Sequence, residues 1–398
     1  MSTLRPARGT ATAAPAREAR PRPAEAGTRR AYWWQGREGR RYCALVYALG
    51  MLGLVFVFSS SFPHAGRPNS GADPSYFFRH HLVYFLLGLA AMLAVSSLRP
   101  LTLARGASWL MAGSVGLLLL LFVYGVRIGG SLNWMEVFGV RFQPSELVKA
   151  AYVLFMAMMV ARGSRGGDNA KRIGLMVALT ALLVIILLKQ KDLGMAVLIM
   201  GIALGMALLG GMKLHWWSLL FLAVSAVGFA AAWTEPYRRA RLLAWIDLAH
   251  HRSGVGYHVY GMLISLARGG VPGSGLGMSP DKWRTLPVPH TDSIFCVIGG
   301  ELGLWGGVGV IALMALLGLW AFGIARNAPN RLGWFLAAGS GLALFLQAFI
   351  NIAVATATVP VTGLTLPFIS YGGTSLISCM ILAGLVLSVA GEREQAEG

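Results

Sequence analysis

Long apolar runs recur along the chain, and short polar stretches separate them. Each run is about as long as the roughly 20 residues that a helix needs to cross a bilayer. The runs are continuous rather than alternating, which favours helices over a β-barrel. The eighth run exceeds one span, and its glycines indicate close helix packing. We predict ten transmembrane helices, at residues 43–61, 80–98, 106–126, 146–161, 172–188, 193–212, 215–233, 293–325, 332–356 and 374–391.

The composition supports an all-α polytopic membrane protein. Of the 398 residues, 56% are hydrophobic and 13% are charged, and the mean hydropathy is +0.62. These values exclude an ordinary soluble domain. The three cysteines lie in or beside apolar runs, so no extracellular disulfide framework is expected. The sequence contains no P-loop, zinc-ligand spacing or dinucleotide fingerprint.

The chain divides into a tail, a membrane domain and a short end. Residues 1–42 carry ten arginines against three glutamates and are rich in Ala, Pro and Gly. We predict a disordered basic cytoplasmic tail without a signal peptide. This tail supplies much of the net charge of +18, so that charge does not indicate nucleic-acid binding. Residues 43–391 form the membrane domain, and 392–398 a short cytoplasmic tail.

The distribution of basic residues sets the orientation. Arginines and lysines are concentrated in the tail and in the short loops on the same side, which places both termini in the cytoplasm. Residues 234–292 then form a large extracellular loop. Within it we predict an amphipathic helix on the membrane at 255–267 and unusual backbone angles at the glycine-rich stretch 269–277. The loop arginines suit phosphate groups, although a solvated charged loop fits them equally well.

Several polar residues stand at the predicted outer ends of spans. Glu146 and Lys149 share a helix face, which faces other helices or water; an internal structural ion pair is the alternative. Trp134 on its own would be an interfacial anchor. Asp192 is placed to cap the sixth span, a role compatible with a functional site.

Asp292 ends the long loop at the mouth of the eighth span. A carboxylate at a membrane edge is energetically unfavourable and is usually retained for a task. Asp292 is therefore either a catalytic base or a helix cap. Between the ninth and tenth spans, the segment 362–375 (TGLTLPFISYGGTS) is interrupted by Pro and Gly. Irregular backbone at membrane depth must be buried in protein or line a cavity, so we predict the wall of an internal cleft, with a tight turn as the alternative.

These groups, in this order, resemble motifs of the SEDS family, named for shape, elongation, division and sporulation. The similarity covers roughly residues 43–390. It is closer to the division members, FtsW, than to the elongation members, RodA. The chain departs from the family pattern at Asn133, Lys191, Ser293 and Gly300. The matching motifs are 143–149 (QPSELVK), 192–194 (DLG), 286–292 (LPVPHTD), 301–303 (ELG) and 367–375 (PFISYGGTS).

The resemblance implies an enzyme that polymerises lipid II into β-1,4-linked peptidoglycan strands on the outer face of the bacterial cytoplasmic membrane, for division or elongation. It implies that Asp292 is the essential aspartate, and the chemistry suits a general base. A lipid II flippase and a non-catalytic scaffold are the alternatives. The residues assigned to the substrate cleft are Trp134, Glu146, Lys149, Lys191, Asp192, His290, Thr291, Glu301 and Ser370.

Two further expectations concern ligands and partners. The departing pyrophosphate needs cations, which Lys149, Lys191, loop arginines or a Mg²⁺ or Mn²⁺ ion would supply. Such an ion would be held by Asp192 or Glu146. The resemblance implies a class B penicillin-binding protein as a partner, together with other membrane proteins of the division or elongation complex, and no nucleic acid.

Overall fold

The computed structural model describes residues 32–65, 75–128, 130–137, 139–164, 169–252 and 254–397. Most of the predicted tail, residues 1–31, lies outside the described residues. The first helix begins at Arg37, six residues before the predicted membrane domain, and the last helix continues to Glu397.

A helix occurs at each of the ten predicted positions within the described chain. Eight of these helices are long and apolar enough to cross a membrane, whereas α6 and the apolar part of α7 are shorter. Ten spans therefore stay a prediction. The helices are α1 (Arg37–Ala65), α2 (Tyr76–Ser96), α3 (Pro100–Tyr124), α4 (Pro144–Ala161), α5 (Asn169–Lys189), α6 (Leu193–Leu209), α7 (Leu214–Thr234), α11 (Ile294–Arg326), α12 (Arg331–Ala355) and α13 (Gly373–Glu397).

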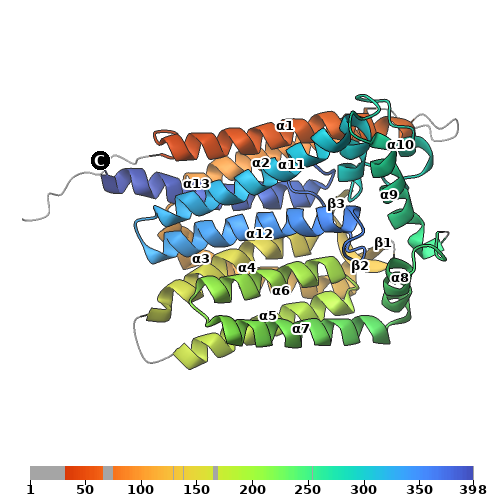
Figure 1. Cartoon of the computed structure of the whole chain (residues 1–398). Helices are drawn as coiled ribbons and strands as arrows, with labels where there is room; N and C mark the ends of the chain where they lie inside the picture. The colour runs from red at the N-terminus through yellow and green to blue at the C-terminus, as the bar shows by residue number, and fades with distance from the viewer. Residues whose placement is uncertain are drawn as a thin grey trace, which may run out of the picture. The chain divides into compact units, whose positions relative to one another are not determined.

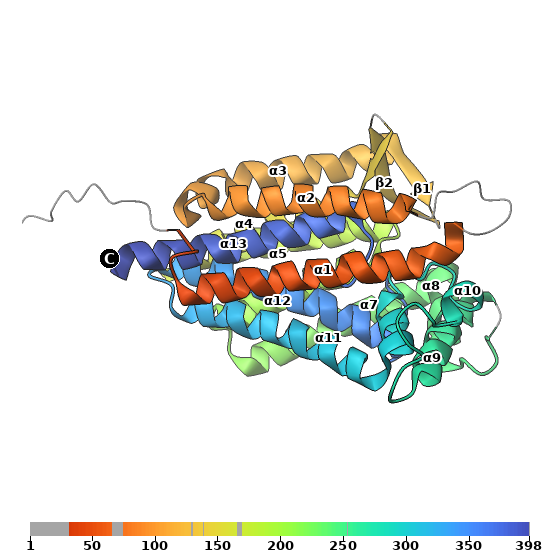
Figure 2. The same ribbon diagram turned by 90° about the horizontal axis from the view of Figure 1, so that it is seen from above.

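The long helices lie side by side, and the polar loop elements gather at one end of them (Figure 1). Helices α4 and α13 are the most buried, whereas α2 and α5 are the least buried. The start of α1 and the end of α13 lie at the end opposite to α8, α9 and α10 (Figure 2). This arrangement agrees with termini on one side and the long loop on the other.

The long loop is largely helical. It contains α8 (Pro236–Ile246), a 3₁₀ turn η2 (Gly254–Gly256), α9 (Tyr257–Gly269) and α10 (Asp281–Arg284). A helix at 255–267 is confirmed within about two residues, and its predicted place on the membrane stays a prediction. The apolar face of α9, with Val259 and Met262, is buried, and α9 packs against α11. Burial against protein withdraws that face from lipid.

The extra length of the eighth run reflects a break in α11 at Gly303, where φ is 67° and ψ is −157°. The glycine-rich loop packs into this break. The backbone N–H groups of Ser274 and Gly275 donate to the carbonyl oxygens of Gly300 (3.0 Å) and Glu301 (2.9 Å). A Cβ on Gly303 would collide with the Val271 carbonyl. The predicted unusual backbone is confirmed by the positive φ angles of Gly270, Gly273, Gly275 and Gly277.

A small antiparallel sheet follows α3, and the all-α prediction is wrong there. Its strands are β1 (Gly125–Ile128), β2 (Ser131–Val137) and β3 (Val140–Phe142), in that order. Val126 pairs with Trp134, and Met135 pairs with Phe142. The strands are too short for an alternating pattern to stand out beside the neighbouring spans. The sheet lies at the same end of the molecule as the long loop (Figure 1), and its strand β2 contains Trp134.

Candidate active site

Asp292 lies two residues before the first residue of α11 and is partly open to solvent, with 17% of its side chain exposed. Its Oδ1 accepts a hydrogen bond from the Thr291 hydroxyl at 3.0 Å. Its backbone carbonyl accepts from Asn351 Nδ2 of α12 at 3.0 Å. Ser293, rather than Asp292, occupies the N-cap position of α11. The carboxylate is thus held in place and accessible, and it is not the helix cap.

The segment 362–375 fixes the position of the loop that carries Asp292. The Tyr371 N–H donates to the His290 carbonyl at 2.8 Å, and Asn351 Nδ2 donates to the Leu364 carbonyl at 2.7 Å. The buried His290 ring packs on Phe77, with ring centroids 4.3 Å apart. Ser370 Oγ accepts from the Leu366 N–H at 2.8 Å and is likewise buried. Irregular backbone is therefore stabilised by protein contacts, as membrane depth requires.

Asp192 lies beside the start of the segment 362–375, near Thr362. It caps α6 by accepting from the Met195 N–H at 3.2 Å, as predicted, and it also accepts from Gln143 Nε2 (3.0 Å) and Ser145 Oγ (3.1 Å). Burial raises the pKa of the Asp192 carboxyl, and these hydrogen bonds oppose that increase. A Cβ on Gly194 would collide with the Thr362 carbonyl, so α6 begins directly against the segment 362–375.

Glu146 and Lys149 form a buried ion pair. Lys149 Nζ lies 2.7 Å from Glu146 Oε2 and 2.5 Å from Gln347 Oε1 of α12, and its side chain has no exposed surface. Ser378 Oγ of α13 donates to the Glu146 carbonyl at 2.6 Å. The predicted shared face is confirmed. The ammonium group is enclosed by α4, α12 and α13, so this arrangement corresponds to the internal ion pair.

Glu301 is also buried, and it pairs with Lys282 of α10. Lys282 Nζ lies 2.9 Å from Glu301 Oε1, and Ser59 Oγ of α1 donates to the same carboxylate at 2.7 Å. Lys282 was not among the predicted site residues. No spacing rule links it to Glu301, because the two residues meet only after α10 folds back against the start of α11.

Trp134 and Lys191 lie near the turn between α5 and α6. The Leu132 N–H of β2 donates to the Gln190 carbonyl at 2.9 Å, and Ser131 Oγ donates to the Lys191 carbonyl at 3.1 Å. Lys191 Nζ is partly exposed and lies 3.1 Å from Glu235 Oε1. Trp134 is half-buried in β2. The structure thus gathers His290, Thr291 and Asp292 in one group and Glu146, Lys149 and Asp192 in another, and the segment 362–375 connects them. Glu301 instead pairs with Lys282.

The donor set around Asp192 and Glu146 does not fit a metal ion in this arrangement. Hydrogen-bond donors contact the Asp192 oxygens, and Lys149 contacts Glu146. Within the described ranges, no group of three or more His, Cys, Asp or Glu side chains is placed to hold a metal. Ion binding there would require these donors to move.

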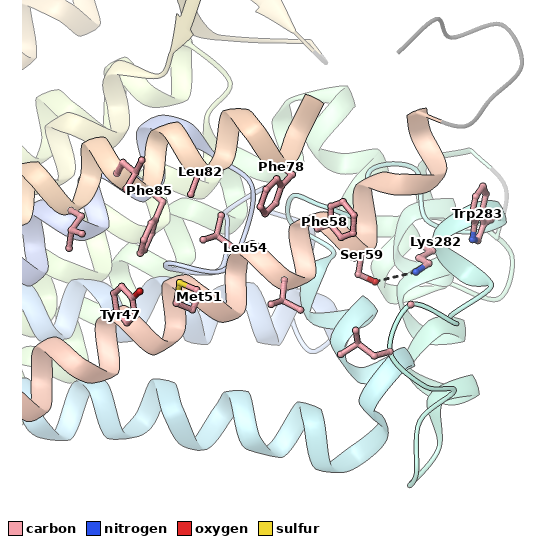
Figure 3. A pocket seen from close by; sticks show the side chains of 15 residues that line it. Tyr47, Met51, Leu54, Phe58, Ser59, Phe78, Leu82, Phe85, Lys282 and Trp283 are labelled. Atoms are coloured by element: carbon pink, nitrogen blue, oxygen red, sulfur yellow. Dashed lines mark hydrogen bonds between the residues drawn. The ribbon is translucent and has the colours of Figure 1, made fainter. Parts of the chain in front are cut away.

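An apolar groove lies between α1 and α2 and reaches Lys282 (Figure 3). Its volume is about 1030 Å³. Ser59 and Lys282 are the polar side chains at one end, where the dashed line in Figure 3 marks their hydrogen bond of 3.2 Å. Apolar side chains of α1 and α2 form the rest of the groove walls, among them Met51, Leu54, Phe78, Leu82, Phe85 and Leu86.

Besides Lys282, residues that contact site groups and were missing from the predicted set include His258, Gln347 and Asn351. Gln347 and Asn351 carry a signal in the sequence, because two amides four residues apart interrupt an otherwise apolar span. Their side chains bond to backbone or side-chain groups at Thr365 and Leu364. His258 carries no such signal, because a histidine in an amphipathic helix of a polar loop is unremarkable in sequence.

Comparisons with known proteins agree with this architecture. The model of the cell cycle protein family FtsW/RodA/SpoVE matches residues 40–395. A probable peptidoglycan glycosyltransferase FtsW of Methylococcus capsulatus is 36% identical over 90% of this chain and 92% of its own. The corresponding protein of Thioalkalivibrio sulfidiphilus is 38% identical over 88% of each chain.

Solved structures give the same result. A chain from a peptidoglycan synthase complex, described for its coordination of polymerization and crosslinking, superposes with a TM-score of 0.72 at 28% identity, over 89% of this chain and 98% of that one. The rod shape determining protein RodA of Thermus thermophilus gives a TM-score of 0.66 at 29% identity, over 89% and 96% of the two chains.

Proposed function

We propose that this chain, which belongs to the FtsW/RodA/SpoVE family of cell cycle proteins, is a peptidoglycan glycosyltransferase that polymerises lipid II on the outer face of the cytoplasmic membrane. The observation that carries the proposal is Asp292, a partly exposed carboxylate fixed beside the segment 362–375. The relatives named FtsW support a role in cell division.

In the proposed reaction, a sugar 4-hydroxyl attacks the anomeric carbon of a muramyl unit. The new glycosidic bond forms as the bond to the polyprenyl pyrophosphate breaks. Attack from the face opposite the leaving group converts the α-pyrophosphate into a β-1,4 linkage. Asp292 accepts the hydroxyl proton, a contribution of about 10²–10⁴-fold to the rate.

Among the cations expected for the pyrophosphate, Lys191 is better placed than Lys149. Lys191 is 45% exposed and forms a solvent-accessible ion pair with Glu235, which an incoming phosphate can displace. Lys149 is fully enclosed. We therefore assign Lys149 a structural role and Lys191 a role in balancing the charge of the leaving group.

The groove between α1 and α2 suits part of the polyprenyl chain, because its walls are apolar. Replacing Leu82 with Trp should fill the groove and raise the KM for lipid II roughly 3–10-fold with little change in kcat, as expected for lost uniform binding. Steady-state assays with long-chain and short-chain lipid II measure this. Leu93→Trp, an exposed position elsewhere on α2, is the control. An unchanged KM for the long-chain substrate would refute the assignment.

Trp134 is proposed to contact the substrate sugar. Trp134→Ala should lower the polymerisation rate by about tenfold or more, equivalent to roughly 1.4 kcal/mol, with normal expression. Trp109→Ala, which removes an exposed Trp from α3, should leave the rate unchanged. Unchanged turnover in Trp134→Ala would reduce this residue to an interfacial anchor.

A class B penicillin-binding protein is the proposed partner, because the matched complex couples polymerization to crosslinking. The proposal is tested with proteoliposomes that carry lipid II on one face, with and without that partner. Glycan polymer indicates the enzyme. Scrambling of lipid II without polymer would identify a flippase. Absence of both activities would favour the non-catalytic scaffold.

A further inference from the structure

His258, the second residue of α9, lies beside the proposed base. Its Nε2 is 2.6 Å from Ser293 Oγ and 3.8 Å from Asp292 Oδ1. The His258 side chain is 24% exposed, so it lies near Asp292 and is also partly open to solvent. Helix α9 lies against the start of α11 at the end of the bundle that carries the loop (Figure 2).

The other ionisable groups near α9 have partners of their own. Asp281 pairs with Arg268, Glu301 pairs with Lys282, and the Arg252 guanidinium lies over the Tyr260 ring at 5.5 Å. Helix α12 contributes the neutral Asn351, and Cys296 of α11 is buried. The titratable and charged groups on or beside α9 and on the near parts of the elements packed against it are Arg252, Tyr257, Tyr260, Arg268, Asp281, Lys282, Arg284, Asp292, Cys296 and Glu301. Arg326 and Arg331 belong to the distant ends of α11 and α12.

We propose that His258 is a positioning residue that receives the proton from Asp292 and returns the carboxylate to its basic form. This role rests on the proposed function. The sugar hydroxyl gives its proton to Asp292 as the glycosidic bond forms, so each cycle leaves a carboxylic acid. The acid must lose that proton before the next hydroxyl can be activated.

The ring geometry suits this transfer. When the proton of neutral His258 is on Nδ1, Nε2 accepts from the Ser293 hydroxyl and its lone pair is directed towards the start of α11. Asp292 Oδ1 is 3.8 Å from Nε2, beyond direct hydrogen-bond distance. A small ring movement must therefore release the Ser293 hydroxyl and turn the single lone pair of Nε2 towards Asp292, directly or through a bridging water. The proton passes from Asp292 to Nε2, and the imidazolium releases it to solvent through its exposed part. No other reactant is consumed.

The competing explanation is that the bond between His258 and Ser293 only anchors α9 to α11. The pH profile separates the two roles. Imidazoles titrate between about pH 5 and 8, and an imidazolium cannot accept a proton. The wild-type rate should therefore fall as the pH decreases through that range. In His258→Gln, which retains an amide able to bond to Ser293, the fall in this range should disappear. The rate at pH 7.5 should decrease roughly tenfold.

The matched control is His250→Gln, because His250 forms a similar pair with Asp247 (2.8 Å) in the same loop but is 82% exposed. This control should keep the wild-type rate and profile. If His258→Gln does not accumulate in the membrane, Ser293→Ala serves instead, with a smaller rate loss and a displaced profile expected. Wild-type rate and profile in the accumulating variant would overturn the proposal.

The Asp292→Asn variant, assayed in parallel, distinguishes the two levels of the hypothesis. If Asp292→Asn is inactive and His258→Gln resembles the wild type, only the role of His258 fails. If Asp292→Asn remains active, the base assignment itself is wrong.

Discussion

Replacement of Asp292 with asparagine is expected to abolish polymerisation of lipid II, with a rate loss of about 10²–10⁴-fold or more. The substitution keeps the size and shape of the side chain but removes its ability to accept a proton. The backbone carbonyl that bonds to Asn351 is unaffected. The protein should therefore fold and insert as the wild type does. The measurement is the rate of glycan formation by purified protein with its partner.

The control for this prediction is Asp247→Asn, which removes another loop carboxylate. Asp247 is about half exposed and pairs with His250, so its loss should leave the rate unchanged. Full activity in Asp292→Asn would eliminate the general-base role. Equal losses in both variants would instead indicate a general effect of loop charge on binding.

The helical framework could be predicted because bilayer-length apolar runs are visible without knowledge of tertiary contacts. The sequence showed only that the eighth apolar run is longer than one span needs. It could not place the break at Gly303, because that position depends on the glycine-rich loop that packs into it. The sheet that carries Trp134 could not be recognised, since its short strands give little periodicity.

The candidate site was only partly predictable for a related reason. Local spacing predicted that Glu146 and Lys149 pair, and that Asp192 caps α6, because both interactions lie within a single helical turn. Spacing along a helix does not reveal how deeply a side chain is buried between helices, so the enclosure of Lys149 by three helices could not be inferred. The contacts of Asp292 with His258 and Asn351 join residues 34 and 59 positions apart, at separations for which sequence periodicity carries no information.

Loss of Lys149 should be strongly destabilising because it leaves the Glu146 carboxylate buried without its counter-charge. Lys149→Met is expected to lower the free energy of unfolding by about 3–5 kcal/mol. The double variant Glu146→Gln, Lys149→Met should recover much of this loss, since no unpaired charge remains. Arg141→Met breaks the exposed pair with Glu136 and should cost about 1 kcal/mol or less. Reversible unfolding in detergent measures all three. A loss in Lys149→Met no larger than in Arg141→Met would contradict the structural role and return Lys149 to the leaving-group site, where its removal would lower activity at unchanged stability.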